Sequence, residues 1–347
     1  MSAAPLMVNA LAKLRDKSAL DVYEMTEAME AIMSGACSDG DIEEFLVLLR
    51  EKGETVDEIG VAARVMRKHA LRLSKHYPDL LDTCGTGGDA KQTINVSTLA
   101  AIVACSAGVE VGKHGNRSVS SRCGSADLLE ALDVKVDLPV RAIEASIEKV
   151  GFGFFFAPKF HPATRFVMAA RKKIQGKTIF NVLGPLTNPG GALHQLVGVY
   201  SEGLVMTIAE VLSGLGAQRA LVVHGMDGLD EITTCDKTLV AELDKGKIKT
   251  YTVSPEDFNL KRASLGALRC ATPEQSKEKA LGILEGEAGP AKDIVCFNAG
   301  AALYVAGKVR SIQEGVRLAE ELIETGEAYE KLEEIVEFTQ NAHAYTV

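Results

Sequence analysis

The chain has 347 residues and a formal net charge of -9, with 46% hydrophobic and 24% charged residues. These values are typical of a soluble globular protein, and the length suits one large α/β domain or a large domain with a small satellite. The negative charge argues against a general nucleic-acid binder, so any phosphate ligand must be met by local groups.

Cysteine usage and the apolar segments predict a reduced, cytoplasmic protein. The seven cysteines are scattered and form no C-x-x-C pair, which favours free thiols over a disulfide framework or a zinc site. The N-terminal apolar run is too short for a signal peptide. No window approaches the roughly 18 uninterrupted apolar residues of a membrane span. We therefore expect no membrane partner.

Residues 1–72 predict a small helical domain. Ser38–Asp41 precedes apolar residues at helical spacing, and Thr55–Glu58 has the pattern of a capping box before another such run. No alternation typical of strands interrupts this region.

Residues 73–347 predict a larger α/β domain, in which short apolar runs alternate with helical patterns. The expected strands are 80–83, 109–112, 154–157, 195–200, 220–224 and 239–243, and the expected helices include 96–107, 125–132, 139–150, 203–215, 273–284, 295–306 and 310–325. This alternation implies a mostly parallel central sheet flanked by helices, with ligands at the carboxyl ends of its strands.

A glycine-rich turn follows the first expected strand. Gly85-Thr-Gly-Gly-Asp89 comes directly after an apolar run, and amides that glycine exposes at a strand end often cradle phosphate oxygens, although such turns also occur without ligands. Asn95-Val-Ser-Thr98 then opens a helix. Its hydroxyls either cap that helix or, together with its free amides and dipole, hold a pyrophosphate or a metal-bound anion.

The segment Lys113–Arg122 places four basic side chains, three serines and an asparagine in ten residues of an acidic protein. A solvated basic run seldom mixes its charges with so many hydroxyls, so we predict an anion site. Ser125, at the start of the next helix, adds a contact or only a cap. His114 has an alternative structural role, in which a neutral ring pairs with a neighbouring backbone group.

Two further positions carry charge that a site could use. Asp230 and Glu231 follow a strongly apolar strand, and adjacent carboxylates that stay charged usually have a cation such as Mg²⁺ nearby. A carboxylate pair in a solvated loop is the alternative. Arg171 lies in a helical pattern, where it either faces solvent or pairs bidentately with a carboxylate.

Taken in order, these segments resemble the anthranilate phosphoribosyltransferase family. GTGGD, NVST, KHGNRSVSS, HPA, GPLTNP and DGLDE occur in the family's order, and the likeness runs from the helical region to Asn298–Val305. The ordered set is highly specific, although each motif alone is not. The resemblance implies a helical domain to which the segment 168–190 returns, a homodimer formed through the helical domains, and transfer of a phosphoribosyl group to anthranilate in tryptophan biosynthesis.

The resemblance also implies roles for individual residues. Those implied to bind phosphoribosyl pyrophosphate are Gly85, Gly88, Asp89, Thr93, Asn95, Val96, Ser97, Thr98, Lys113, His114, Gly115, Asn116, Arg117, Ser118, Val119, Ser120, Ser121 and Ser125. Gly85, Asn116 and Arg171 would contact anthranilate, and Ser97, Asp230 and Glu231 would hold two Mg²⁺ ions. The motifs supply no general base, so no catalytic residue is assigned and catalysis would rest on positioning and electrostatics.

The chain departs from the family pattern at Asp133, Cys123 and Ala169–Ala170, which directs attention to packing around the acceptor end. Two other functions remain as alternatives. One is a pyrimidine nucleoside phosphorylase of the same fold, whose glycine-rich and Lys-Ser motifs differ from those of this chain. The other is a non-catalytic relative that binds nucleic acid, against which the carboxylate pair and the negative charge both argue.

Overall fold

The computed structural model describes residues 3–117, 123–270 and 272–345. Four helices form an N-terminal bundle: α1 Ala3–Arg15, α2 Val22–Met33, α3 Asp39–Lys52 and α4 Val56–His69. Ser38 and Thr55 are the N-caps of α3 and α4, and each forms the reciprocal hydrogen bonds of a capping box. The two helix starts predicted from the sequence are therefore confirmed.

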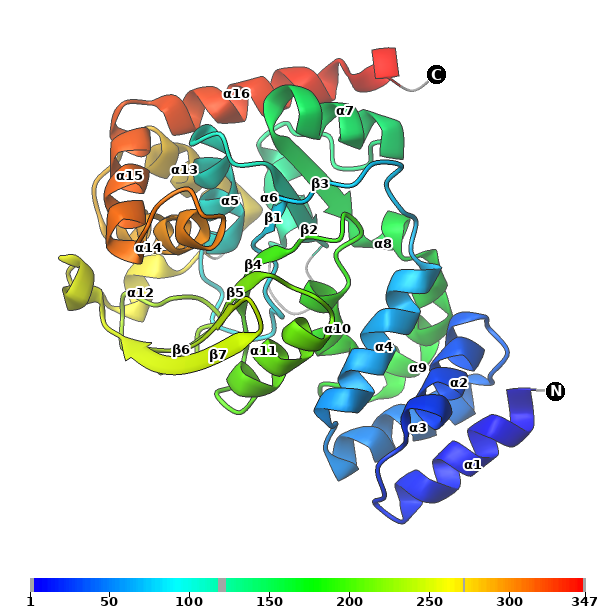
Figure 1. Cartoon of the computed structure of the whole chain (residues 1–347). Coiled ribbons are helices and arrows are strands. Elements are labelled where there is room, and N and C mark those ends of the chain that lie inside the picture. Colours follow the sequence, from blue (N-terminus) through cyan, green and yellow to red (C-terminus); the bar gives the residue numbers. More distant parts are fainter. Residues whose placement is uncertain (1–2, 118–122, 271, 346–347) are drawn as a thin grey trace.

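A later segment packs against this bundle, as Figure 1 shows for α9 (Met168–Lys173) and α10 (Phe180–Leu186). Val167, Ala170 and Leu183 are buried in the same apolar cluster as the bundle helices. Two arginines of the bundle also hold the segment by its backbone: Arg50 donates to the carbonyl oxygen of Gln175 at 2.8 Å, and Arg67 to that of Leu186 at 2.7 Å.

Seven strands form one sheet in the order β3-β2-β1-β4-β5-β6-β7. The first five in the chain pair in parallel, whereas β6 and β7 pair antiparallel at one edge. The strands are β1 Leu81–Asp82, β2 Val111–Gly115, β3 Phe152–Phe156, β4 His194–Gly198, β5 Arg219–Gly225, β6 Thr238–Asp244 and β7 Lys247–Val253. The predicted fold class, a helical domain beside a mostly parallel α/β domain, is confirmed.

Helices cover both faces of the sheet. Side chains alternate along β5, so that Leu221 and Val223 join one apolar cluster while Ala220 and Val222 join the other. The remaining helices are α5 Val96–Ser106, α6 Ser125–Ala131, α7 Val140–Val150, α8 Ala157–Phe160, α11 Leu204–Gly214, α12 Leu265–Leu268, α13 Pro273–Leu284, α14 Pro290–Val305, α15 Ile312–Glu324 and α16 Glu327–Gln340. Short 3₁₀ turns span Pro162–Val167, Pro255–Phe258 and Ala342–Tyr345.

Several boundaries differ from those predicted. β2 extends to Gly115, and β3 begins at Phe152, because the two strands pair from Val111 with Phe152 to Gly115 with Phe156. α14 begins at Pro290 rather than residue 295. Strand β7 and helix α16 were not predicted. β7 is mostly exposed, so its sequence shows little apolar alternation. Its pairing with β6 is fixed by a two-residue turn at Lys245 and Gly246, both of which have positive φ.

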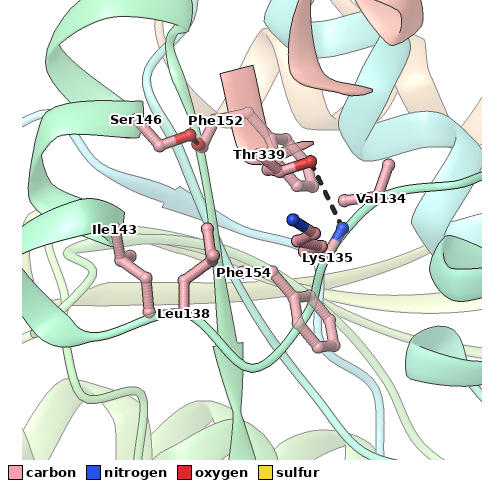
Figure 2. Close-up of a pocket in the computed structure, with 8 residues that line it drawn as sticks. All are labelled: Val134, Lys135, Leu138, Ile143, Ser146, Phe152, Phe154 and Thr339. Atoms are coloured by element: carbon pink, nitrogen blue, oxygen red, sulfur yellow. Dashed lines mark hydrogen bonds between the residues drawn. The ribbon is translucent and has the colours of Figure 1, made fainter. Parts of the chain in front are cut away.

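None of the helices in the described ranges combines the length and apolar character needed to cross a bilayer. A small cavity of about 10 Å³ lies between α7, β3 and Thr339 of α16. Figure 2 shows the residues that line it. A volume of this size accommodates at most one water molecule. It lies beside Phe152 at the start of β3, so it is not at the carboxyl ends where ligands are expected.

Candidate functional site

The glycine-rich turn leaves β1 and packs tightly against β4 and the carboxylate loop. The backbone N–H of Thr86 donates to the carbonyl oxygen of Gly198 at 2.8 Å. A side chain on Gly85 would place its Cβ 3.0 Å from that oxygen and 3.4 Å from an Asp230 carboxylate oxygen. Gly88 has a φ of 79°, a conformation that favours glycine. These glycines are therefore required by the geometry of the turn.

Beyond Asp89 the chain takes a strained path to α5. Ala90 and Gln92 have φ values of 59° and 58°, which are uncommon for residues with a Cβ. The path is fixed by pairing with a distant segment, since Thr93 bridges to Arg269. Such strain at the edge of a predicted site indicates that the surrounding packing determines where Asp89 and Thr93 lie.

The start of α5 faces the carboxylate loop. Asn95 is the N-cap residue, but its amide instead donates to the carbonyl oxygen of Cys123 at 3.0 Å and accepts from Ser276 at 2.8 Å. The backbone N–H of Ser97 donates to Glu231 Oε1 at 3.2 Å. Val96 and Thr98 are buried, and Thr98 Oγ1 has no partner in the described ranges. The first turn of α5 thus offers its amides to an anion.

Lys113 is buried in strand β2 rather than lying on a basic loop. Its side chain is 1% exposed, and its ammonium lies 3.1 Å from Thr83 Oγ1 and 3.3 Å from Ser97 Oγ. A third acceptor is the carbonyl oxygen of Thr83, at 3.4 Å. The first residue of the basic motif therefore lies in a strand. Three oxygen acceptors offset the free-energy cost of burying its ammonium there.

Asp82, at the end of β1, organises the neighbouring backbone. Its carboxylate accepts from the N–H groups of Cys84 at 3.0 Å and His114 at 3.1 Å, and from Asn188 Nδ2 at 2.7 Å. Burial raises the pKa of this carboxyl to about 6, while Lys113 favours the charged form. These bonds connect the turn, strand β2 and the GPLTNP loop.

His114 is a buried, neutral ring, which supports its structural alternative. Nδ1 lies 2.9 Å from the carbonyl oxygen of Gly184, and the ring centroid is 5.0 Å from that of His161. Burial, with a further contribution from His161, lowers the pKa of His114 to about 3. Within the described ranges, Nε2 of each ring has no hydrogen-bond partner.

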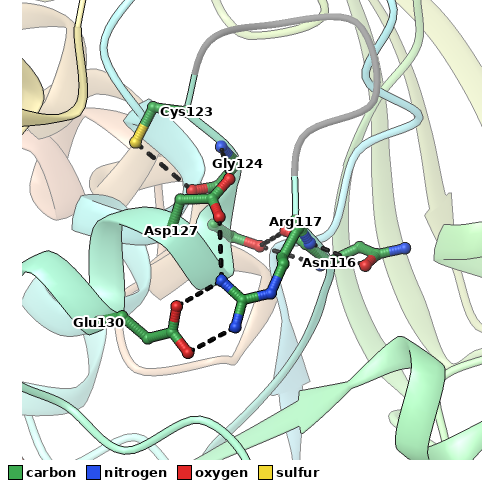
Figure 3. A network of polar contacts seen from close by, with 7 residues as sticks. Asn116, Arg117, Cys123, Gly124, Asp127 and Glu130 are labelled. Carbon is green, nitrogen blue, oxygen red and sulfur yellow. Dashed lines mark hydrogen bonds and ion pairs between the residues drawn. The ribbon is translucent and has the colours of Figure 1, made fainter.

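Figure 3 shows the side chain of Arg117, which points toward Asp127 and Glu130 of α6. The guanidinium of Arg117 pairs with Asp127 at 3.2 Å and with Glu130. The Asn116 N–H donates to Ser125 Oγ at 3.2 Å, while Gly124 rather than Ser125 is the N-cap of α6. The predicted residues Ser118, Val119, Ser120 and Ser121 lie outside the described residues.

Asp230 and Glu231 lie in the loop after β5, at the carboxyl end of the sheet as predicted. Burial raises the pKa of Asp230 to about 7, to which the nearby Asp89 contributes. Burial and the charge of Asp230 raise the pKa of Glu231 as well. In the described ranges no lysine or arginine forms an ion pair with either carboxylate. Lys113 and Lys177 act on this pair only through their charges, so the two carboxylates suit a bound cation.

The backbone of this loop is held on two sides. Asn298 of α14 is fully buried, accepts from the N–H of Ile232 at 3.0 Å and donates to its carbonyl oxygen at 2.8 Å. On the other side, a Cβ on Gly198 would lie 1.5 Å from the carbonyl oxygen of Asp230. The close approach and the paired amide bonds fix where the carboxylates point.

Arg171, on α9, does not lie on a fully solvated helix face. Its guanidinium carbon is 5.5 Å from the centroid of the Phe180 ring, and burial lowers its pKa. No carboxylate pairs with it among the described residues. Ala170, one of the family departures, is buried in the bundle core. Asp133, another departure, has a φ of 65° and pairs with Lys277 of α13.

The donor set fits Mg²⁺. No group of three or more His, Cys, Asp or Glu side chains converges as a complete metal site in the part of the chain that the structure describes. Mg²⁺ is, however, commonly held by one or two carboxylates, with waters and substrate phosphates completing an octahedron. Asp230 and Glu231, with raised pKa values and no bound cation from the protein, provide such a pair.

The fold and this cluster agree with comparisons to known proteins. Residues 8–70 match the helical bundle domain of a glycosyl transferase family, and residues 77–329 match its a/b domain. Anthranilate phosphoribosyltransferase of Moorella thermoacetica is 50% identical over 93% of this chain and 95% of that protein. Its counterpart in Alkalilimnicola ehrlichii is 49% identical over 96% of this chain and 99% of that protein.

Solved structures give the same result. The crystal structure of anthranilate phosphoribosyltransferase from Thermus thermophilus has a TM-score of 0.90 and 46% identity, covering 95% of this chain and 99% of that one. The Saccharomyces cerevisiae enzyme in complex with PRPP and Mg has a TM-score of 0.88 and 27% identity, covering 96% and 98%. The chain belongs to the anthranilate phosphoribosyltransferase family.

Sequence reasoning missed residues that hold the site together. Asn298 was noted only as part of a matching segment, and Asp82 only as a residue within the expected strand 80–83. The sequence contained one signal for Gly198, because a glycine within an apolar strand often marks a place where another backbone segment approaches closely. Lys177, whose Nζ lies 3.2 Å from the centroid of the Tyr200 ring, gave none, because a lone lysine in a polar connection is usually solvated.

Proposed function

We infer that this protein transfers the phosphoribosyl group of phosphoribosyl pyrophosphate to the amine of anthranilate. The products are N-(5-phosphoribosyl)-anthranilate and pyrophosphate, a step of tryptophan biosynthesis. The observation that carries this function is the junction at Ser97, whose N–H donates to Glu231 at 3.2 Å and whose hydroxyl accepts from Lys113 at 3.3 Å. This junction brings the glycine-rich turn, the start of α5, strand β2 and the carboxylate loop to one point.

We assign donor binding to the backbone and hydroxyl groups around this junction. Gly85, Gly88 and the α5 amides would surround the pyrophosphate, where exposed N–H groups and the helix dipole favour negative charge. The Lys113 ammonium, which Thr83 and Ser97 hold by hydrogen bonds, would add its positive charge to this site. We keep the other donor residues that the resemblance implies, apart from the ring of His114, whose contacts are structural. Ser118, Val119, Ser120 and Ser121 are proposed from their sequence alone.

We assign divalent cations to Asp230, Glu231 and Ser97, with two Mg²⁺ ions as the full complement. Bound Mg²⁺ would neutralise the charge that develops on the leaving pyrophosphate. The chain's own contribution is to orient both carboxylates, through the Ile232 peptide that Asn298 holds and the close contact of Gly198 with Asp230. A polyanionic donor would otherwise meet two uncompensated carboxylates.

For the acceptor, we assign Arg171 to the anthranilate carboxylate, with Asn116 and Gly85 nearby. Its partly desolvated guanidinium lacks a carboxylate partner in the described ranges, which suits bidentate recognition of an acid. An aromatic amine is neutral near pH 7, so the reaction needs no general base to activate it. Rate enhancement would come from holding the amine against the anomeric carbon while the leaving group is stabilised.

We also propose a cytoplasmic homodimer that associates through the helical bundles. Three large apolar side chains of α1 and α2 are exposed, with Val8 at 61%, Val22 at 57% and Tyr23 at 59%. They lie on two helices that pack against each other, and an exposed apolar surface can mark a protein interface. Sedimentation of the wild type and of a Tyr23→Glu variant tests this, and an unchanged oligomer would argue against the bundle as the interface.

The decisive experiment follows anthranilate fluorescence in the presence of phosphoribosyl pyrophosphate and Mg²⁺. Fluorescence should fall only when all three components are present. Parallel assays of thymidine phosphorolysis and of salt-dependent DNA binding test the two alternatives. Phosphorolysis or specific DNA binding, with no loss of anthranilate, would replace the proposed function.

A further inference from the structure

Lys177 joins the helical bundle to the glycine-rich turn. It lies between α9 and α10, where Arg50 of α3 donates to its carbonyl oxygen at 3.4 Å and to that of Gln175 at 2.8 Å. Its backbone is thus fixed from the bundle. Its side chain extends to the α/β domain, where a Cβ on Gly88 would lie 3.3 Å from Lys177 Cε.

The ammonium of Lys177 rests on an aromatic ring. Nζ is 3.2 Å from the ring centroid of Tyr200, which follows β4. The N–H of Tyr200 donates to Thr86 Oγ1 at 3.1 Å, so the ring is tied to the same glycine-rich turn. A cation on an aromatic face is attracted to it, but the ring provides no oxygen acceptor for the three N–H donors.

The charges around Lys177 are acidic. Burial lowers its pKa, while the charges of Asp230 and Asp89 act in the opposite direction. Within the described ranges, however, the ammonium makes no hydrogen bond and no ion pair with these carboxylates. Lys113 differs, because its donors already meet Thr83 and Ser97. Lys177 is therefore a cation beside the carboxylate loop whose donors remain available to a ligand.

We propose that the Lys177 ammonium is a direct ligand of the pyrophosphate group, both in the donor and in the released product. The absence of a side chain on Gly88 leaves room for the lysine to reach over the turn. Binding would exchange the contact with the Tyr200 ring for charge-assisted hydrogen bonds to phosphate oxygens. This assignment rests on the proposed function, since it names a further contact for the same donor.

The test measures binding of Mg²⁺-pyrophosphate to the full-length protein by titration calorimetry, independently of turnover. Lys177→Met, which keeps the length of the side chain but removes its charge, should raise Kd about tenfold. Lys177→Arg should restore binding to within about threefold of the wild type. Lys172→Met is the matched control, because Lys172 is an exposed lysine in the same stretch and should not change Kd.

Kinetics separate binding from support of the fold. Lys177→Met should raise KM for phosphoribosyl pyrophosphate and leave KM for anthranilate unchanged. An unchanged Kd, or equal rises in both KM values with a lower Tm, would overturn the assignment and make Lys177 a structural contact of Tyr200. A wild-type protein that binds Mg²⁺-pyrophosphate through Lys177 but does not consume anthranilate would instead refute the proposed function.

Discussion

Two polar clusters occupy the same end of the sheet and differ in how their charges are satisfied. The inner cluster consists of Asp82, Lys113 and Asn188, and the rim cluster consists of Asp89, Asp230 and Glu231. In the inner cluster, the Asp82 carboxylate accepts three hydrogen bonds and the Lys113 ammonium has three oxygen acceptors. In the rim cluster, the carboxylates form no ion pair with a lysine or arginine in the described ranges, and Lys113 and Lys177 act on them only through their charges.

The comparison distinguishes charged groups that the folded protein itself satisfies from charged groups that favour a bound ligand. Burial raises the pKa of Asp82 as well, but the charges of the inner cluster have hydrogen-bond partners and the Asp82 carboxylate has Lys113 as a counter-charge, so this cluster is complete as folded. Carboxylates with raised pKa values and no counter-ion are costly, and such groups concentrate at functional sites. The rim is therefore where we propose that a cation and a polyanionic substrate bind.

The largest expected effect comes from removing the charge of the rim. Converting Asp230 to Asn and Glu231 to Gln together should lower turnover by roughly 100- to 1,000-fold, because an electrostatic element of the transition state is lost. The double variant should remain folded, since the substitutions keep the shape of both side chains. Turnover measured against Mg²⁺ concentration checks this, and near-normal turnover, or full activity in excess chelator, contradicts the metal assignment.

The sequence predicted the rim better than the inner cluster. Asp230 and Glu231 were found because they follow an apolar strand, and that position alone places them at the ligand end of a parallel sheet. The contacts of Lys113 could not be predicted, because a basic motif in a sequence gives no sign that its first residue is a buried strand residue. Likewise, Asn188 and Asn298 form hydrogen bonds to groups far away in the chain, and local patterns carry no information about such partners.

The second prediction concerns the histidine pair beside the inner cluster. Burial lowers the pKa of His114 to about 3 and that of His161 to about 4, against about 6.5 in an unfolded chain. Between the pKa of each ring in the folded protein and about 6.5, the unfolded chain binds more protons than the folded protein. The free energy of unfolding therefore rises with pH over this range and falls as the pH is lowered. Each ring should contribute on the order of 3 kcal/mol to the loss between pH 7 and pH 4.

Urea unfolding at pH 7, 5.5 and 4 measures this loss in the wild type and in His161→Asn. The variant lacks one titrating ring, so its stability should fall less steeply between pH 7 and pH 4. Equal slopes in the two proteins would show that the ring of His161 remains able to protonate in the folded state.

A smaller effect is expected at Arg171, which lies on the bundle side of the site. Arg171→Ala should raise KM for anthranilate by roughly 10- to 150-fold, the range expected for one charge-assisted pair, with little change in KM for the donor. Arg171→Lys should rescue only part of the loss, because lysine keeps the charge but lacks the planar fork. A rise confined to the donor KM would move Arg171 to the phosphate side, and no change in either KM would leave it as a partner of Phe180.

The smallest effect is expected at Ser97, where the inner and rim clusters meet. Its backbone N–H faces Glu231, and its hydroxyl accepts from Lys113. Ser97→Ala keeps the first contact and removes the second, so the donor KM should rise about threefold to tenfold, as for one hydrogen bond. Because Asn95 rather than Ser97 is the N-cap of α5, the free energy of unfolding should change by less than about 1 kcal/mol. Donor kinetics and urea unfolding on the same preparation separate the two roles, and a loss of stability with an unchanged donor KM would make the hydroxyl a support for Lys113 alone.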